Sequence, residues 1–173
     1  FAGVFGDEGG GWGKLRENAE TFAGHKTGLV TERQLEALAA GEPLSGYLQD
    51  VRAIVLPGLR HLSAEAARGL ERFVADGGSV IALGTAPTRD QYDRPLELQA
   101  PLAGTLGDVH DAQLMVALDA ALRDAGVVAP SRLLDAEGEL VYGVEHIAVP
   151  WQGGWLVNVS NYRHEEPVAS LHI

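Results

Sequence analysis

The sequence predicts an α/β fold: a parallel sheet with flanking helices, followed by a small antiparallel β element. Three observations predict the sheet. Residues 51–56 are a compact apolar strand, residues 63–76 have helical periodicity, and residues 79–83 are a second apolar strand. Short links join these segments, and a strand, a helix and a strand so connected form a right-handed crossover between parallel strands.

Strands and helices also alternate on the N-terminal side of this unit. The segments predicted there are a strand at 1–5, a glycine-rich run at 6–13, a helix at 14–23, a strand at 28–30 and a helix from residue 32. Thr31 suits the N-cap of the last helix because Gln34 stands at the capping-box position, and Gly41 is a stop signal. Ser63 and Gly77 mark the ends of the central helix in the same way.

The periodicity changes in the C-terminal part of the chain. Residues 84–107 are rich in Pro, Asp and Arg, which predicts a long loop over the carboxyl edge of the sheet. Asp108 or Asp111 then caps a helix that ends near residue 125, with Leu114, Leu118 and Leu122 on one face.

A β-rich element follows this helix. Residues 140–149 and 155–160 alternate like strands around residues 152–154, whose sequence Gln-Gly-Gly is a hairpin signature. Residues 167–173 resemble a third strand. The predicted domains are therefore an α/β domain at 1–130 and a C-terminal hairpin or sandwich element at 131–173.

The composition is that of a globular protein with an acidic surface. Hydrophobic residues make up 46% of the 173, and 13 Lys and Arg against 24 Asp and Glu give a net charge of −11. Binding to nucleic acid or to anionic lipid needs a basic face, so we expect neither partner. No apolar run approaches the roughly 20 residues that span a bilayer.

The chain has no cysteine. This excludes disulfides, thiolate metal sites and cysteine nucleophiles. It fits a reducing compartment and so favours the cytoplasm, although secreted bacterial enzymes can lack cysteine too. Phe1 is not an initiator residue, and both ends of the sequence interrupt strand-like patterns, so we expect the chain to be part of a longer one.

Two loops occupy positions at which α/β proteins often bind ligands. The run at 6–13 matches no phosphate-binding motif, and Asp7 and Glu8 would repel phosphate, so a flexible linker is the favoured interpretation. The strand end at residues 56–58 carries no serine or cysteine of a nucleophile elbow. Ser63 is explained by helix capping. Neither loop is predicted to be catalytic.

Side chains for metal binding or acid–base catalysis show no characteristic spacing. The six histidines are at positions 25, 61, 110, 146, 164 and 172. None forms the spaced pair of a zinc site, although a site assembled from distant positions stays open. Glu165 and Glu166 are adjacent in a predicted turn, whereas a glycosidase pair must straddle its substrate. We therefore predict no catalytic residue, no metal and no cofactor.

The tryptophans are the best candidates for a contact surface, either to a sugar or to another subunit. Trp151 and Trp155 flank the hairpin turn, and Trp12 lies in the glycine-rich run. A tryptophan ring can stack on a sugar face or anchor a protein interface. Burial in the core of the domain itself is the competing interpretation.

Several segments together resemble one known family. In the α/β region they are residues 28–35 (GLVTERQL), 51–58 (VRAIVLPG), 62–65 (LSAE) and 73–81 (FVADGGSVI). This pattern resembles the β-galactosidase trimerisation domain, which follows the catalytic barrel in family 42 glycoside hydrolases. The resemblance implies a flavodoxin-like, class I glutamine-amidotransferase-like fold for the α/β domain at 1–130. Residues 142–145, 154–161 and 166–168 are similar to the small β-sandwich at the C-terminus of such enzymes.

The resemblance implies a role in assembly rather than in catalysis. An active amidotransferase needs a cysteine nucleophile, and the glycosidase carboxylates would lie in an upstream barrel that 173 residues cannot include. The expected partners are further copies of the chain, as a trimer, and the carbohydrate substrate of the parent enzyme.

Three hypotheses follow, in order of preference. The first is a non-catalytic oligomerisation region of a larger β-galactosidase-like glycoside hydrolase, which also walls the active site of a neighbouring subunit. The second is a stand-alone amidotransferase-like sugar-utilisation protein, with His61 or His110 in its active site. The third is a carbohydrate-binding module that uses Trp151 and Trp155.

Overall fold

The computed structural model describes residues 2–4, 11–106, 111–165 and 167–173, with the backbone alone at 2–4, 11, 12, 47 and 111. Its helical segments are α1 (Gly11–Arg16), the π-helical η1 (Glu17–Phe22), α2 (Glu32–Ala39), the 3-10 turn η2 (Gly46–Leu48), α3 (Ala64–Ala75) and α4 (Asp111–Asp124). Its strands are β1 (Ala2–Val4), β2 (Gly28–Val30), β3 (Ala53–Pro57), β4 (Ser79–Leu83), β5 (Leu102–Leu106), β6 (Arg132–Leu134), β7 (Val144–Trp151), β8 (Gly154–Asn161) and β9 (Ser170–His172).

The first five strands form one parallel sheet in the order β2-β1-β3-β4-β5. In its centre, β3 and β4 align Ala53 with Ser79 and Pro57 with Leu83. This is the strand order of flavodoxin-like doubly wound folds, in which the order reverses between the first and third strands. The predicted flavodoxin-like fold class is confirmed.

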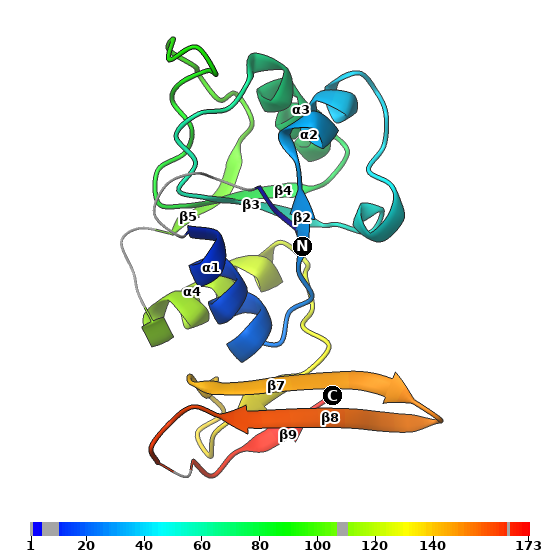
Figure 1. Cartoon of the computed structure of the whole chain (residues 1–173), viewed down its shortest axis with the longest axis vertical. Coiled ribbons are helices and arrows are strands. Elements are labelled where there is room, and N and C mark those ends of the chain that lie inside the picture. The colour runs from blue at the N-terminus through cyan, green and yellow to red at the C-terminus, as the bar shows by residue number, and fades with distance from the viewer. Residues whose placement is uncertain (1, 5–10, 107–110, 166) are drawn as a thin grey trace.

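Helices cover both faces of the sheet. Ile54 and Leu56 of β3 pack in the cluster that contains α2 and α3, whereas Ala53 and Val55 pack in the cluster that contains α1, η1 and α4. All four side chains are fully enclosed. Figure 1 shows α2 and α3 on one side of the sheet and α1 and α4 on the other. Burial on both faces is the reason that this strand is an unbroken apolar run.

The helix starts follow the sequence signals. Thr31 Oγ1 accepts a hydrogen bond from the backbone N–H of Gln34 at 3.3 Å, and the Thr31 N–H donates to Gln34 Oε1 at 2.8 Å. Ser63 Oγ accepts from the N–H of Ala66 at 3.1 Å. The N–H of Ser63 donates to Glu32 Oε1 at 2.6 Å, so a side chain of α2 also holds the start of α3. Ser63 is an N-cap, as predicted.

Helices α2 and α3 approach each other closely at Gly69. A Cβ atom at this position would lie 1.9 Å from the carbonyl oxygen of Leu35. Any side chain there would push the two helices apart, and therefore this glycine is needed for the packing of the layer.

The first helix differs from the prediction. It begins at Gly11, inside the predicted glycine-rich run, and continues from residue 17 as the wider turn η1, in which the N–H of Ala23 donates to the carbonyl of Asn18 at 3.2 Å. The predicted inward face of Leu15, Ala19 and Phe22 is confirmed, since all three are buried. The residues at 5–10 lie outside the described part of the chain.

Two strands were absent from the prediction. β5 lies within the predicted loop 84–107 and pairs with β4 through a register shift at Val80 and Ile81. It is an edge strand with a glycine at its centre, so it lacks the apolar run that identifies β3 and β4. β6 pairs antiparallel with β9, which is the predicted third strand of the C-terminal element. Three-residue strands give too little pattern to recognise.

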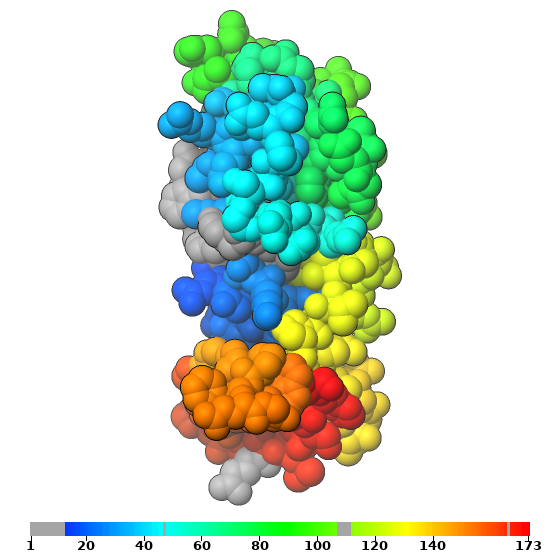
Figure 2. All heavy atoms as spheres, turned by 90° about the vertical axis from the view of Figure 1, so that its right-hand side faces the viewer, coloured from blue at the N-terminus to red at the C-terminus, as the bar shows by residue number. Residues whose placement is uncertain are grey.

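The antiparallel strands lie at one end of the elongated molecule, beyond α1 and α4 (Figures 1 and 2). Phe22, Ala23 and Met115 pack there against Leu140 and Tyr142. The division of the chain at residues 130 and 131 stays a prediction. Leu114, Leu118 and Leu122 of α4 are buried as expected, but the predicted caps at Asp108 and Asp111 lie outside the described side chains. No helix within the described ranges is long and apolar enough to cross a membrane.

Candidate functional site: the C-terminal hairpin and its junction

The hairpin is built on a two-residue turn. Gln152 and Gly153 join β7 to β8 with φ angles of 48° and 80°. Two residues of positive φ give the type I′ turn, whose twist matches that of the strands, and glycine adopts this conformation without steric cost. The register then runs without interruption from Trp151–Gly154 to Val144–Asn161. The predicted hairpin is confirmed.

The two tryptophans of the hairpin lie on opposite faces. Trp151 is paired with Gly154, and the next pair along the ladder is Pro150 with Trp155. Residues directly across a ladder share a face, and consecutive pairs alternate between faces. Trp151 is 60% exposed and Trp155 is 49% exposed, so neither is buried in the core. The rings therefore cannot form one flat platform. Their predicted contact to a sugar or a subunit stays a prediction.

One face of the hairpin is apolar and open to solvent. We call it the outer face; it consists of Ile147, Val149, Trp151 and Leu156, which are 40–60% exposed. The residues at 147, 149 and 151 alternate along β7, and Leu156 is directly across from Val149. The polar end of this face is Glu145, whose carboxylate accepts a hydrogen bond from the hydroxyl of Tyr162 at 2.8 Å. Asn158 lies directly across from Ile147 on this face, and Ile147 and Val149 also border the junction cavity, whose lining includes Glu20 and Lys26.

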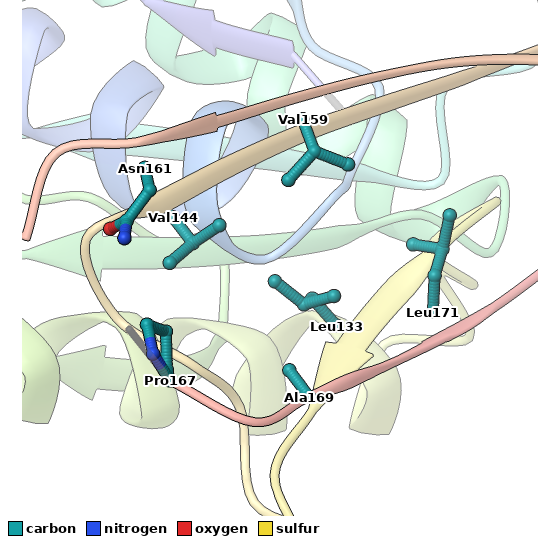
Figure 3. Close-up of a pocket in the computed structure, with 7 residues that line it drawn as sticks. All are labelled: Leu133, Val144, Val159, Asn161, Pro167, Ala169 and Leu171. Atoms are coloured by element: carbon teal, nitrogen blue, oxygen red, sulfur yellow. The ribbon is translucent and has the colours of Figure 1, made fainter. Parts of the chain in front are cut away.

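The opposite face borders a groove toward β6 and β9 (Figure 3). The groove has a volume of about 370 Å³ and is lined by Leu133, Val144, Val159, Asn161, Pro167, Ala169 and Leu171. Asn161 is the polar side chain of this lining. Its Nδ2 donates to the carbonyl of Glu165 at 2.9 Å, and its Oδ1 accepts from the N–H of Arg163 at 2.8 Å. The groove thus offers apolar contact and little polar recognition.

A buried ionic cluster fastens the hairpin element to the helices. His25, which follows η1, donates from Nε2 to Asp119 Oδ1 of α4 at 2.9 Å, and Arg132 of β6 donates to Asp119 Oδ2 at 2.8 Å. The side chains of His25 and Asp119 are 0% and 5% exposed. Burial alone would raise the pKa of Asp119, but the hydrogen bond from His25 and the charge of Arg132 outweigh it and lower this pKa. The cluster is an electrostatic link between three elements.

A second histidine closes the same junction. His146 of β7 is buried, and its Nε2 lies 3.3 Å from the carbonyl oxygen of Ser131, to which it donates. Burial lowers the pKa of His146, which keeps its ring neutral. A Cβ at Gly24 would lie 2.7 Å from this Nε2 and 2.1 Å from the Ser131 oxygen, so a glycine is required for the contact.

A small cavity of about 110 Å³ lies at this junction, lined in part by Glu20, Lys26 and Pro130. It is smaller than the roughly 300 Å³ at which small-molecule sites begin. The junction therefore holds the hairpin in place and leaves no room for a substrate.

The carboxyl edge of the parallel sheet carries one histidine–carboxylate contact. His61 Nε2 and Asp93 Oδ1 are 3.2 Å apart, and their side chains are 36% and 68% exposed. Both side chains are open to solvent, and an ion pair in such a setting contributes little to stability. His110, Asp7 and Glu8 lie outside the described residues, as does Glu166, whereas Glu165 pairs with Arg163 at 2.9 Å.

No cluster of three metal-ligating side chains occurs among the residues with described positions. The buried pairs at the junction serve a structural purpose, and the apolar hairpin is an exposed feature whose outer side is open to solvent in the described part of the chain. Trp12 belongs to α1, but its side chain is outside the described part.

Sequence reasoning found the hairpin and its tryptophans but missed the junction. His25 and Asp119 are separated by 94 positions, and nothing local links them. The outer face had a signal, because apolar residues at 147, 149 and 151 alternate with the register of a strand.

These observations define a flavodoxin-like α/β protein with an appended antiparallel element. No family model matches the chain, and no curated protein is similar to it in sequence. A solved structure that shares its fold is the apo exo-carrageenase GH42 from Bacteroides ovatus, with a TM-score of 0.56 and 19% sequence identity. The match covers 86% of this chain and 19% of that chain, so this chain spans about a fifth of the length of the enzyme.

Proposed function

We propose that this chain is a non-catalytic accessory region of a larger glycoside hydrolase and that it supports subunit assembly. The observation that carries the proposal is the fold shared over 86% of this chain with 19% of a family 42 exo-carrageenase. A region that corresponds to 19% of an enzyme has the size of an accessory domain, and the rest of such an enzyme is large enough for the catalytic domain. The similarity to the β-galactosidase trimerisation domain, a trimeric state and a contribution to the active-site wall belong to this proposal.

The distribution of polar and apolar side chains supports a role in assembly. Buried polar groups such as Asp119 and Ser63 have structural partners, and the hairpin carries exposed tryptophan and aliphatic side chains. Aromatic residues are enriched at the centres of protein interfaces and dominate their energetics. The carbohydrate partner would be the substrate of the parent enzyme and not a ligand of this chain.

The two other hypotheses receive less support. A carbohydrate-binding module that uses both Trp151 and Trp155 would need their rings on one side, whereas the ladder places them on opposite faces. A stand-alone enzyme would rest on His61, whose partner Asp93 is largely exposed to solvent. Neither hypothesis has an observation that favours it over assembly.

The proposal is tested on the 173-residue chain by two measurements. Light scattering over a concentration series should give a mass that is a multiple of 18.3 kDa. Assays with β-galactosides and with carrageenan oligosaccharides should show no hydrolysis. A chain that stays monomeric at every concentration would contradict the assembly role, and hydrolysis by this chain would contradict the non-catalytic role.

A further inference from the structure

We propose that the outer face of the hairpin binds the same face of a second copy of this chain, around a twofold axis. The inference rests on the proposed function, because it presupposes self-association, and it adds the surface and the symmetry. The four side chains concerned are Ile147, Val149, Trp151 and Leu156. A twofold contact pairs chains, and a threefold contact would have to use another surface of the molecule.

The apolar area of the outer face reaches the size that a specific contact needs. From the exposed fractions of 40–60%, and with up to about 250 Å² for a tryptophan, the four side chains offer on the order of 300–400 Å². Apolar atoms make up about 65% of a homodimer interface, so two such faces correspond to a total of roughly 1,000 Å² with their polar rims. This is the lower end of the range for biological interfaces.

Charge favours a second copy as the occupant. The chain has a net charge of −11, so two copies repel each other over most of their surfaces. Between residues 144 and 161 the single acidic side chain is Glu145, at the end of the hairpin away from Trp151, and no Lys or Arg occurs. Glu20 and Lys26 border the same cavity as Ile147 and Val149, and their charges are opposite in sign. Like chains can therefore approach at this face with less repulsion than a strongly acidic surface would give.

The chemistry of the face argues against polar ligands. A sugar stacked on Trp151 would need hydrogen-bonding side chains beside the ring, but its neighbours on this face are Val149 and Leu156. A nucleic acid would need cations. An apolar face of complementary shape meets the requirements, and a twofold contact would bring the same patch of two copies together.

The geometry of a strand also allows self-pairing. The residues at 147, 149 and 151 form a row about 13 Å long, with Trp151 at one end and Ile147 at the other. In a twofold arrangement the rows run in opposite directions, so Trp151 packs near Ile147 of the partner subunit. Large and small side chains then interdigitate, as they do between the packed sheets of a sandwich.

The test compares two faces of one hairpin. Trp151→Gln and Leu156→Gln alter the outer face, and Trp155→Gln removes a tryptophan of similar exposure from the opposite face. All three positions are solvent-exposed, and circular dichroism and thermal unfolding verify that each variant is folded. The measurement is the assembly mass and its dissociation constant by analytical ultracentrifugation of the full 173-residue chain.

We expect Trp151→Gln and Leu156→Gln each to weaken association about tenfold or more and to halve the assembly mass, with little change for Trp155→Gln. Unchanged association in both outer-face variants would overturn this inference while leaving the assembly role intact. A larger effect of Trp155→Gln than of Trp151→Gln would also overturn it. A monomeric wild-type chain would instead contradict the proposed function itself.

Discussion

The central strand β3 and the hairpin strands β7 and β8 are both rich in apolar residues, but their surroundings differ. In β3, Ile54 and Val55 are 0% exposed, because helices lie against both faces of the sheet. In β8, Leu156 is 58% exposed and Val159 is 53% exposed. The same kind of sequence thus forms an enclosed core in one place and an open surface in the other.

The difference comes from the covering elements. Helices cover both faces of the parallel sheet, whereas β6 and β9, with three residues each, lie beside only the face of the hairpin opposite Leu156. The outer part of the hairpin extends beyond its cover. A two-stranded hairpin alone is marginally stable, so the hairpin depends on its junction with the helices. The parallel sheet needs no such support.

The largest expected effect comes from making the same substitution, leucine to alanine, once in each of the two regions. Leu56→Ala in β3 removes an enclosed side chain and should lower the free energy of unfolding by about 2–5 kcal/mol. Leu156→Ala in β8 should change it by about 0.5 kcal/mol or less, since that side chain is mostly exposed. Urea unfolding followed by circular dichroism measures both. Similar losses for the two variants would mean that the hairpin is packed as tightly as the sheet.

The next effect concerns the junction between the regions. Asp119→Ala leaves His25 buried without its acceptor and removes a partner of Arg132, so the free energy of unfolding should fall by about 2–4 kcal/mol. Arg123→Ala is the matched control, because its guanidinium is exposed and 3.7 Å from the same carboxylate. Hydrogen exchange should show the amides of β6 and β7 losing protection first. Equal losses in the two variants would speak against a buried junction.

A smaller effect is expected between α2 and α3. Gly69→Ala places a methyl group against the Leu35 carbonyl, and relieving that clash should cost about 1–3 kcal/mol of stability. Gly13→Ala is the control in another helix, where no atom lies within 4 Å of the added Cβ and alanine favours the helix. Thermal unfolding of the two variants should shift in opposite directions, and a neutral Gly69→Ala would show that the helices can separate freely.

The smallest effect is the dependence of the junction on pH. The pKa of His146 is lowered by burial, so the unfolded chain binds its proton more readily than the folded chain does. This contribution to stability is therefore fully present above the usual pKa of 6.5 and falls as the pH drops below it. His146→Asn should flatten this slope in urea titrations made at several pH values. A slope that is the same with and without His146 would contradict a role of this histidine in the pH dependence.

The sequence was a good guide to elements whose signals are local. The Thr31 capping box, the Ser63 cap and the apolar run at 53–56 each depend on a few neighbouring residues, and each is present in the fold. β5 escaped because an edge strand with Gly104 in its centre has neither a continuous nor an alternating pattern. The parallel direction of the strands follows from the alternation of strands and helices, but the strand order and the register shift next to β5 do not.

The candidate site was predictable only in part, for a related reason. The turn at Gln152 and Gly153 and the nearby tryptophans can be read from the sequence. The faces on which Trp151 and Trp155 lie depend on the pairing register, which a one-residue slip would reverse. The cluster of His25, Asp119 and Arg132 joins distant segments and becomes visible only after folding.

The opposed tryptophans also give the hairpin two separate optical reporters. Because Trp151 and Trp155 project from different sides of a thin ladder, a change in solvent on one side alters the emission of one indole and leaves the other in its original surroundings. Acrylamide quenching of the two single-substitution variants would therefore distinguish the sides of the hairpin without any added label. The pairing register that keeps the two rings apart thus lets their fluorescence report separately on the two faces of the hairpin.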